Sequence, residues 1–261
     1  MGTGSQFKID LSRTFPHLAN APIVEAVIEI RARVEAVWEE SEIVPRLKSK
    51  LPDYPDTHSI NAVTQQFTFE TAAAPKIGTH EMGWDGLRMR SADTHHVVQF
   101  TRDSFLFSRL QPYESWEHLE NEAMRLWEIH SEVAKPREIQ RLGVRFINRI
   151  PMPPKETRFE DYIEPHAQTP RELDLPFLNF LHKETFVVPG SVYGINITKT
   201  LQFPQNRLVE GVGILIDVDV FTVVPFILDE NGLKGRLKEM RWLKNKSFFG
   251  SITAKALEVF R

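Results

Sequence analysis

A row of arginines in the middle of the chain is the feature of this sequence best suited to binding an anion. Arg141, Arg145 and Arg149 recur at every fourth residue within the segment RLGVRFINRI. In an extended strand such side chains share one face and lie roughly 13 Å apart, at about 3.3 Å per residue. Guanidinium groups bind phosphates and carboxylates through paired N–H donors. The spacing therefore predicts a basic row that can face an anionic ligand, a nucleic acid or the carboxylates of a neighbouring strand.

The acidic partners for this row are found near the N-terminus. Glu25 and Glu29 alternate with apolar residues in the segment IVEAVIEIRARV, which has the periodicity of a half-buried strand. Oppositely charged side chains on adjacent strands stabilise a sheet, so we favour cross-strand pairing and a structural role for the arginines. The alternative is a nucleic-acid surface that combines the row with Arg31, Arg33, Arg88 and Arg90.

Asp217 and Asp219 form a second candidate site. They stand two residues apart on one face of a strongly alternating segment, where two carboxylates can hold a divalent cation or act as acid and base if further ligands converge. Glu210 falls on the opposite face, and Lys199 offers a cross-strand partner instead. A metal-dependent hydrolase built on the two aspartates therefore remains an alternative hypothesis.

The motifs of the commonest enzymes are absent from the sequence. There is no phosphate-binding loop, dinucleotide-binding glycine run, GxSxG elbow or HExxH. The chain has no cysteine, which excludes disulfides, thiolate metal sites and cysteine nucleophiles. We therefore expect a protein without a cofactor or a bound metal that is not an enzyme.

The candidate side chains lie in a chain that alternates between strand and helix patterns. Apolar residues at every second position predict a long strand over 24–34, and helical spacing after Ser115 predicts a helix that ends before Pro136. Further strands are predicted over 63–71, 87–91, 95–101, 104–110, 138–150, 177–188, 192–203 and 208–224, and further helices over 41–51, 233–244 and 251–260.

This order of elements predicts an α+β fold in which antiparallel sheets pack against long helices. The chain divides into a flexible N-terminus over 1–18, a first half over 19–136 and a second half over 137–261, which we expect to form one compact unit. Each half reads as β-α-β(n)-α, an order typical of helix-grip or TATA-binding-protein-like folds. The two halves share no repeat at the level of residues, so their similarity is a hypothesis about topology.

Composition and charge indicate a soluble globular protein. Hydrophobic residues make up 41% and charged residues 26% of the 261, and no window approaches the roughly 20 apolar residues of a membrane span. The first ten residues lack the apolar centre of a signal peptide, so we expect a cytoplasmic protein. The net charge of −3 is unfavourable for a protein that coats nucleic acid.

Three segments together resemble a known family. LANAPIVEAVIEI near the N-terminus, RLGVRFINRI in the middle and FFGSITAKALEVF near the C-terminus are similar to the signature segments of a sporadically distributed family of uncharacterised bacterial proteins of about this length. The resemblance spans nearly the whole chain. It implies an accessory role in bacteria, defence systems included, and it supplies no catalytic residues.

The sequence thus predicts a non-enzymatic cytoplasmic binding or interaction protein. We expect its polar sheet face to bind a protein partner or an anionic ligand. Nucleic acid is a less favoured partner, and we expect no association with a membrane. The residues expected to carry this binding are Arg141, Arg145 and Arg149.

Overall fold

The computed structural model describes residues 7–68, 76–152, 158–164, 172, 175, 178–203 and 211–260, with the backbone alone at 64–68, 76–82, 230 and 231. The strands are β1 (Ile23–Val34), β2 (Asp56–Thr68), β3 (Lys76–Arg90), β4 (His96–Thr101), β5 (Ser104–Leu110), β6 (Pro136–Pro151), β7 (Leu181–Val187), β8 (Tyr193–Gln202), β9 (Gly213–Thr222) and β10 (Phe226–Ile227). The helices are α1 (Glu40–Lys50), α2 (Trp116–Ala134), the short 3-10 turn η1 (Phe159–Asp161), α3 (Glu230–Phe249) and α4 (Ala254–Glu258).

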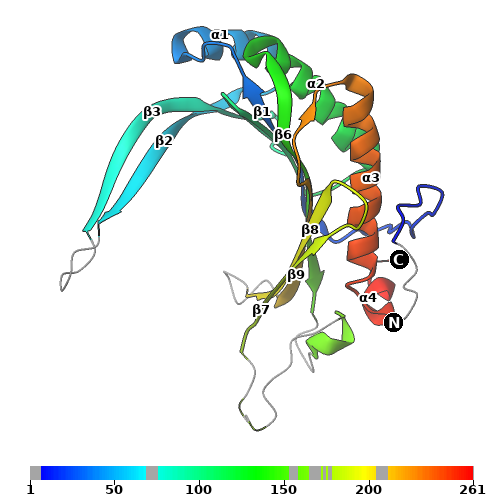
Figure 1. Ribbon diagram of the computed structural model, residues 1–261. Coiled ribbons are helices and arrows are strands. Elements are labelled where there is room, and N and C mark those ends of the chain that lie inside the picture. The colour runs from blue at the N-terminus through cyan, green and yellow to red at the C-terminus, as the bar shows by residue number, and fades with distance from the viewer. Residues whose placement is uncertain are drawn as a thin grey trace.

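One large antiparallel sheet organises the molecule, which is an α+β protein as the sequence predicts (Figure 1). Its strand order is β2-β3-β4-β5-β1-β6-β9-β8-β7, and β10 pairs with β6. The first strand of each predicted half, β1 and β6, pair with each other at the centre of the sheet. Strands from both parts of the chain therefore share one continuous hydrogen-bonded sheet.

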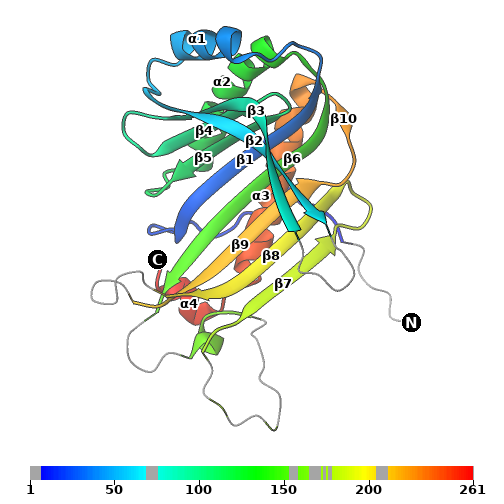
Figure 2. The ribbon, with the colours of Figure 1, turned by 90° about the vertical axis from the view of Figure 1, so that its left-hand side faces the viewer.

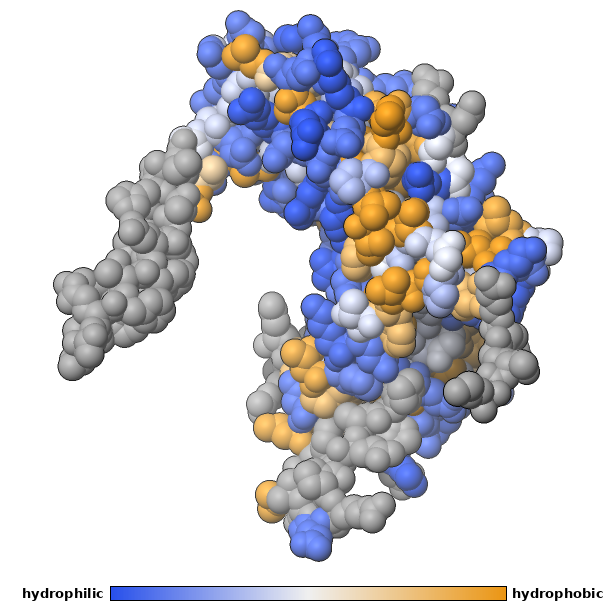
Figure 3. Space-filling model, viewed as in Figure 1, coloured by the Kyte–Doolittle hydropathy of each residue, from blue (hydrophilic) through white to orange (hydrophobic). Residues whose placement is uncertain are grey.

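The two faces of this sheet differ. Helix α2 packs on β5 and β1, and α3 packs on β9 and β6, so both cover one side, which we call the helix face. The other side, the open face, carries no helix of the described chain, and the sheet curves around it (Figures 1 and 2). Hydrophilic residues line the inner side of this curve (Figure 3). The alternation of apolar and charged residues along β1 and β6 produces this division.

The ends of α2 follow local sequence signals. The Ser115 side chain accepts a hydrogen bond from the His118 N–H at 3.1 Å, which satisfies one of the free donors of the first turn. At the other end Lys135 adopts a left-handed conformation, with φ of 52°, and Pro136 begins β6. The predicted helix between Ser115 and Pro136 is confirmed.

Two predictions about the elements need correction. The predicted long helices are not found, because α2 and α3 have 19 and 20 residues and α1 has 11. The hairpin of β2 and β3 is longer than the predicted strands over 63–71 and 87–91, with 13 and 15 residues. Polar residues interrupt the alternation in this hairpin, so the pattern of apolar residues marks only part of each strand. Residues 69–71 of the first prediction and 208–210 of the prediction over 208–224 lie outside the described residues.

The segment before β1 lies across α3 on the helix face. Phe15 stacks on Phe249 with 5.6 Å between ring centroids, and it meets Trp242 edge-on at 6.0 Å. Phe7 also meets the Trp242 ring edge-on, at 6.2 Å. Residues 1–6 of the N-terminus predicted to be flexible lie outside the described residues. Among the described helices, none combines the length and the apolar character that crossing a membrane requires.

Candidate functional site

The arginine row lies on the open face of β6, where carboxylates of the neighbouring strands hold two of its members. Arg141 binds Glu29 of β1 and also Asp219 of β9, with Nη2 3.0 Å from Oδ2. Arg145 forms two parallel hydrogen bonds to Asp217, at 2.8 Å and 2.6 Å. The predicted pairing with Glu29 is therefore confirmed. Glu25 forms no ion pair with the row among the described residues, although its charge is one of those that raise the pKa of Arg145, and Asp217 of β9 is the hydrogen-bonded partner of that arginine.

Arg149 differs from the other two arginines. Its Nε donates to the side-chain oxygen of Gln202 at 2.9 Å, and its Nη2 donates to the carbonyl of Gly211 at 2.7 Å. It forms no ion pair with any residue that the structure describes. The row is thus a cross-strand network of hydrogen bonds in which most of the positive charge is already neutralised.

The same network bears on the two alternatives from the sequence. Arg31 binds Glu29 at 2.8 Å and Arg33 approaches Glu138 at 3.6 Å, so the wider set of arginines proposed for nucleic acid is also paired in part. Asp217 and Asp219 are held by guanidinium groups, and the described residues contain no cluster of three or more histidines and carboxylates suited to a metal. On the open face, the positively and negatively charged side chains are therefore largely paired with each other.

We expect the Arg141→Met substitution to lower the free energy of unfolding by about 2 kcal/mol, because it leaves the carboxylates of Glu29 and Asp219 without their shared donor. These three side chains are 25%, 15% and 18% exposed. The control is Arg145→Met: the Arg145 side chain is 49% exposed, and its exposed pair should contribute less than about 1 kcal/mol. Urea unfolding of both variants measures the difference, and equal losses would contradict the bridging role of Arg141.

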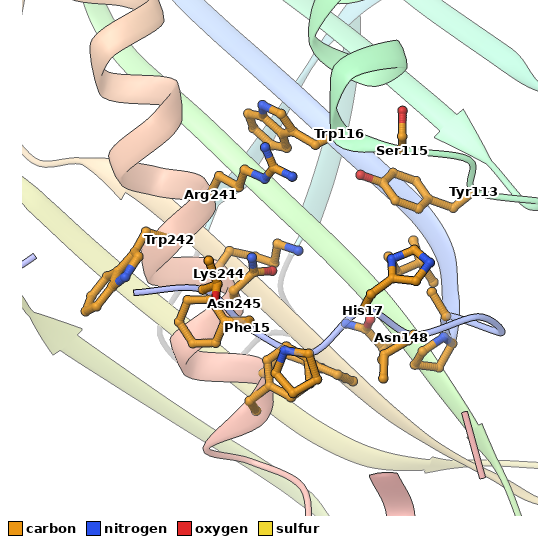
Figure 4. Close-up of a pocket in the computed structure, with 18 of the residues that line it drawn as sticks. Phe15, His17, Tyr113, Ser115, Trp116, Asn148, Arg241, Trp242, Lys244 and Asn245 are labelled. Carbon is orange, nitrogen blue, oxygen red and sulfur yellow. The ribbon is translucent and has the colours of Figure 1, made fainter. Parts of the chain in front are cut away.

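A pocket of about 770 Å³ lies on the helix face, away from the arginine row. We call it the Lys244 pocket. Its walls come from the segment 11–23, the start of α2 with the residues before it (113–117), and the C-terminal half of α3 (238–249), and Asn148 of β6 also lines it (Figure 4). Segments far apart in the sequence therefore meet around one space.

Lys244 is the unusual residue of this pocket. The residue is only 9% exposed, and its Nζ lies 3.9 Å from the centroid of the Phe146 ring. It forms no hydrogen bond or ion pair with any described residue, although an ammonium group has three donors. Burial, with a smaller contribution from the Arg241 charge, lowers the pKa of Lys244 to about 7. Both the amine and the ammonium forms are therefore populated near neutral pH.

Aromatic rings surround Phe146 beneath this lysine. Tyr113 meets Phe146 edge-on at 5.6 Å, and Trp116 stacks on it at 6.4 Å. The guanidinium of Arg241 lies 5.5 Å from the Trp116 ring and binds Glu117 at 2.9 Å. The start of α2 is thus held against α3, and Tyr113 and Trp116 give the pocket an aromatic wall.

Asn148 supplies a fixed polar group at the pocket. It is 3% exposed, and its Nδ2 donates to the carbonyl oxygens of Phe146 at 3.2 Å and Ile216 at 3.0 Å. Because both bonds use the amide nitrogen, the side-chain oxygen remains as an acceptor. The pocket therefore combines a buried amine, an amide oxygen and aromatic walls.

Sequence reasoning missed this pocket. The predicted helix over 233–244 ended at Lys244, whereas α3 continues to Phe249. A signal was present: Met240 and Phe248 are buried four residues on either side of Lys244, so the lysine occupies a position of the apolar stripe. A lysine at such a position is a candidate for a buried amine.

Comparison with known proteins does not show to which family this chain belongs. No protein-family model matches the sequence, and no curated protein matches it.

Proposed function

We propose that this protein is a non-enzymatic binding protein whose ligand is a small organic anion with a planar aromatic part, held in the Lys244 pocket. The observation that carries the proposal is the buried side chain of Lys244 beside a pocket of about 770 Å³, without a hydrogen-bond acceptor among the described residues. A buried ammonium group is costly unless an acceptor or an opposite charge compensates it. An anionic ligand supplies both.

The charges around the pocket support an anion. The two carboxylates among the described lining residues are already neutralised: Glu117 binds Arg241 at 2.9 Å and Glu114 binds Arg109 at 2.6 Å. Lys244 has no such partner, and further basic residues line the pocket, namely Arg13 and Lys238. A negative ligand therefore meets a net positive surface.

The walls support an aromatic part in the ligand. Aromatic rings stack or meet edge-on at centroid distances of about 4.5–7 Å, and such contacts orient planar groups. The lining includes rings from three segments of the chain, namely Phe15, Tyr113, Trp116, Trp242, Phe248 and Phe249. The acidic residues of the described lining are engaged by arginines, so the charged groups that remain to contact a ligand are mainly basic.

The test uses benzenesulfonate as the anionic probe and the uncharged benzenesulfonamide as its matched control. Calorimetric titration should show benzenesulfonate binding and much weaker binding of the sulfonamide. Lys244→Met should weaken benzenesulfonate binding by about tenfold or more, whereas Lys246→Met, two residues further along α3 and outside this pocket, should retain it.

The pH dependence gives a second readout. Only the ammonium form of Lys244 pairs with an anion, and the pKa of Lys244 is about 7 in the free protein. Benzenesulfonate affinity should therefore fall by up to about tenfold per pH unit above pH 7, and Lys244→Met should remove this dependence. Absence of binding at millimolar probe, or equal binding by wild type and Lys244→Met, would overturn the proposal. Native mass spectrometry of the purified protein would reveal a natural ligand that has remained bound.

We also propose that the two parts of the sheet are topologically related, in the manner of TATA-binding-protein-like folds. The strand order supports this, because in each part the first strand lies at the centre and pairs with the last long strand of its own part: β1 with β5, and β6 with β9. In each part a helix then follows along the chain, α2 after β5 and α3 after β9 and the short β10. This likeness concerns topology and carries no function.

A further inference from the structure

The outermost strand beside β8 carries backbone groups to which no other described residue bonds. β7 pairs only with β8 among the described strands and forms one edge of the sheet (Figure 2). The Val188 N–H donates to the Tyr193 carbonyl at 2.9 Å, so by the alternation of an antiparallel ladder Lys183, Thr185 and Val187 direct their N–H and C=O groups away from β8. No described backbone group bonds to them.

This edge has only part of the usual protection against pairing. Edge strands are commonly shielded by charges, prolines, bulges or a covering element. Here Leu181, Phe186 and Val187 are 74%, 44% and 70% exposed, and the charged residues between them are Lys183 on the open face and Glu184 on the helix face. Lys183 forms no ion pair with a described residue. Among the described residues the edge is therefore unpaired and apolar in part, and Lys183 makes its open face basic.

An apolar groove of about 420 Å³ lies directly inside this edge, on the helix face. We call it the edge groove. Its walls come from β7, from β8, from the end of α3 and from the N-terminal segment, with apolar side chains that include Phe186, Val188, Ile195, Ile197, Leu243 and Phe7. Phe186 belongs both to the edge and to the groove wall. A strand added at this edge thus finds β7 backbone groups that no described residue pairs and, next to them, a groove for its side chains.

We propose that an extended peptide segment of a partner protein, with alternating apolar and acidic residues, adds to the sheet along β7. The register sets the side-chain positions. Peptide residues opposite Glu184 and Phe186 place their side chains on the helix face, over the edge groove, and those opposite Lys183 and Thr185 place theirs on the open face. Apolar side chains suit the first set and an acidic one suits the second, beside Lys183. This site is separate from the Lys244 pocket.

The probe for this inference is an acetylated and amidated heptapeptide in which valine and glutamate alternate, followed by fluorescence anisotropy of a labelled copy. Two control peptides separate the contributions: one carries N-methyl groups on alternate peptide bonds, which prevents strand pairing, and one has lysine in place of glutamate. We expect the valine–glutamate peptide to bind and each control to bind at least about tenfold more weakly.

The protein variants test the edge itself. Lys183→Pro removes an N–H that points away from β8, so the sheet should keep its own hydrogen bonds, and the peptide affinity should fall by about tenfold. Lys183→Ala removes the side chain and keeps the N–H, so its effect should be smaller, and thermal melting verifies that both variants fold. Because Lys183→Pro can strain the strand, Phe186→Ser provides an independent test through the groove wall.

Three outcomes would overturn the proposal. They are absence of peptide binding at millimolar concentration, equal binding of the N-methylated peptide, and a concentration-dependent dimer of the protein that Lys183→Pro abolishes. The last result would assign β7 to a contact between two copies of this chain. A variant that no longer binds benzenesulfonate should still bind the peptide, since the Lys244 pocket and the edge groove share no lining residue.

Discussion

The Lys244→Met variant is expected to unfold at higher denaturant concentration than the wild type at pH 7. The folded protein lowers the pKa of Lys244 from 10.5 to about 7, so at neutral pH folding forces a charged lysine toward its neutral form or buries the charge. At about 1.4 kcal/mol per pKa unit, this shift costs up to about 5 kcal/mol of stability. Methionine has a similar length and no charge, and we expect a gain of at least about 2 kcal/mol.

The pH dependence of stability separates this cause from simple repacking. The folded-state pKa of Lys244 lies below its unfolded value, so its cost is complete below pH 7 and disappears as pH rises toward 10.5. Between pH 7 and 9 the wild type should gain up to about 3 kcal/mol that Lys244→Met does not gain. The upper end of this range, pH 9, lies below the pH at which tyrosine side chains ionise. Parallel pH profiles in the two proteins would contradict this account.

Protonation of His130 is the second large expected effect. His130 of α2 is completely buried, and its Nε2 donates to the Thr101 carbonyl at 2.9 Å. Its Nδ1 has no partner among the described residues. Aromatic rings surround it at 5.3–6.1 Å, namely Trp38, Phe100, Phe105 and Trp127. Burial lowers the pKa of His130 from 6.5 to about 4.

This shift predicts a loss of stability in mild acid. Above pH 6.5 the histidine is neutral in both states and contributes no pH dependence. As pH falls from 6.5 to about 4, the unfolded chain binds a proton that the folded protein does not, so stability should fall by about 3 kcal/mol. His130→Phe should lose this component, with a cost of about 1 kcal/mol at neutral pH for the hydrogen bond to Thr101.

The control is another histidine of the same helix. The side chain of His118 is 72% exposed, and His118→Phe should retain the wild-type profile between pH 6.5 and 4. Urea unfolding at half-unit pH intervals gives the comparison. If His130→Phe kept the wild-type slope, the buried imidazole would not be the source of the acid sensitivity.

His130 and Lys244 differ in the pH at which they lower stability, and this difference bears on function. His130 is buried with a hydrogen bond and lies within an aromatic cluster, so its cost appears only in acid. Lys244 costs stability at the pH at which most proteins work, and it does so beside a pocket. A side chain that destabilises the free protein and faces a ligand-sized space is typical of a binding site that the ligand completes.

Local patterns were sufficient for the elements whose signals are contained in a short window. The alternation along β1 and β6 and the cap at Ser115 specify strands and a helix without reference to distant residues, because side-chain direction and capping depend on neighbours in the chain. The β2–β3 hairpin was only partly predictable, since its sequence lacks a strict alternation of apolar and polar residues.

The sequence by itself determined the α+β class, the half-buried central strands and the shared face of the three arginines. These follow from side-chain direction, which repeats every two residues in a strand and about every 3.6 residues in a helix. Tertiary structure alone decided which carboxylate each arginine meets, since placing β9 beside β6 brought Asp217 to Arg145 in place of Glu25. It also decided what surrounds Lys244, because the spacing along α3 only places this lysine within the apolar stripe. The environment of that amine is set by segments 11–23, 113–117 and β6, and spacing within one segment carries no information about contacts between segments.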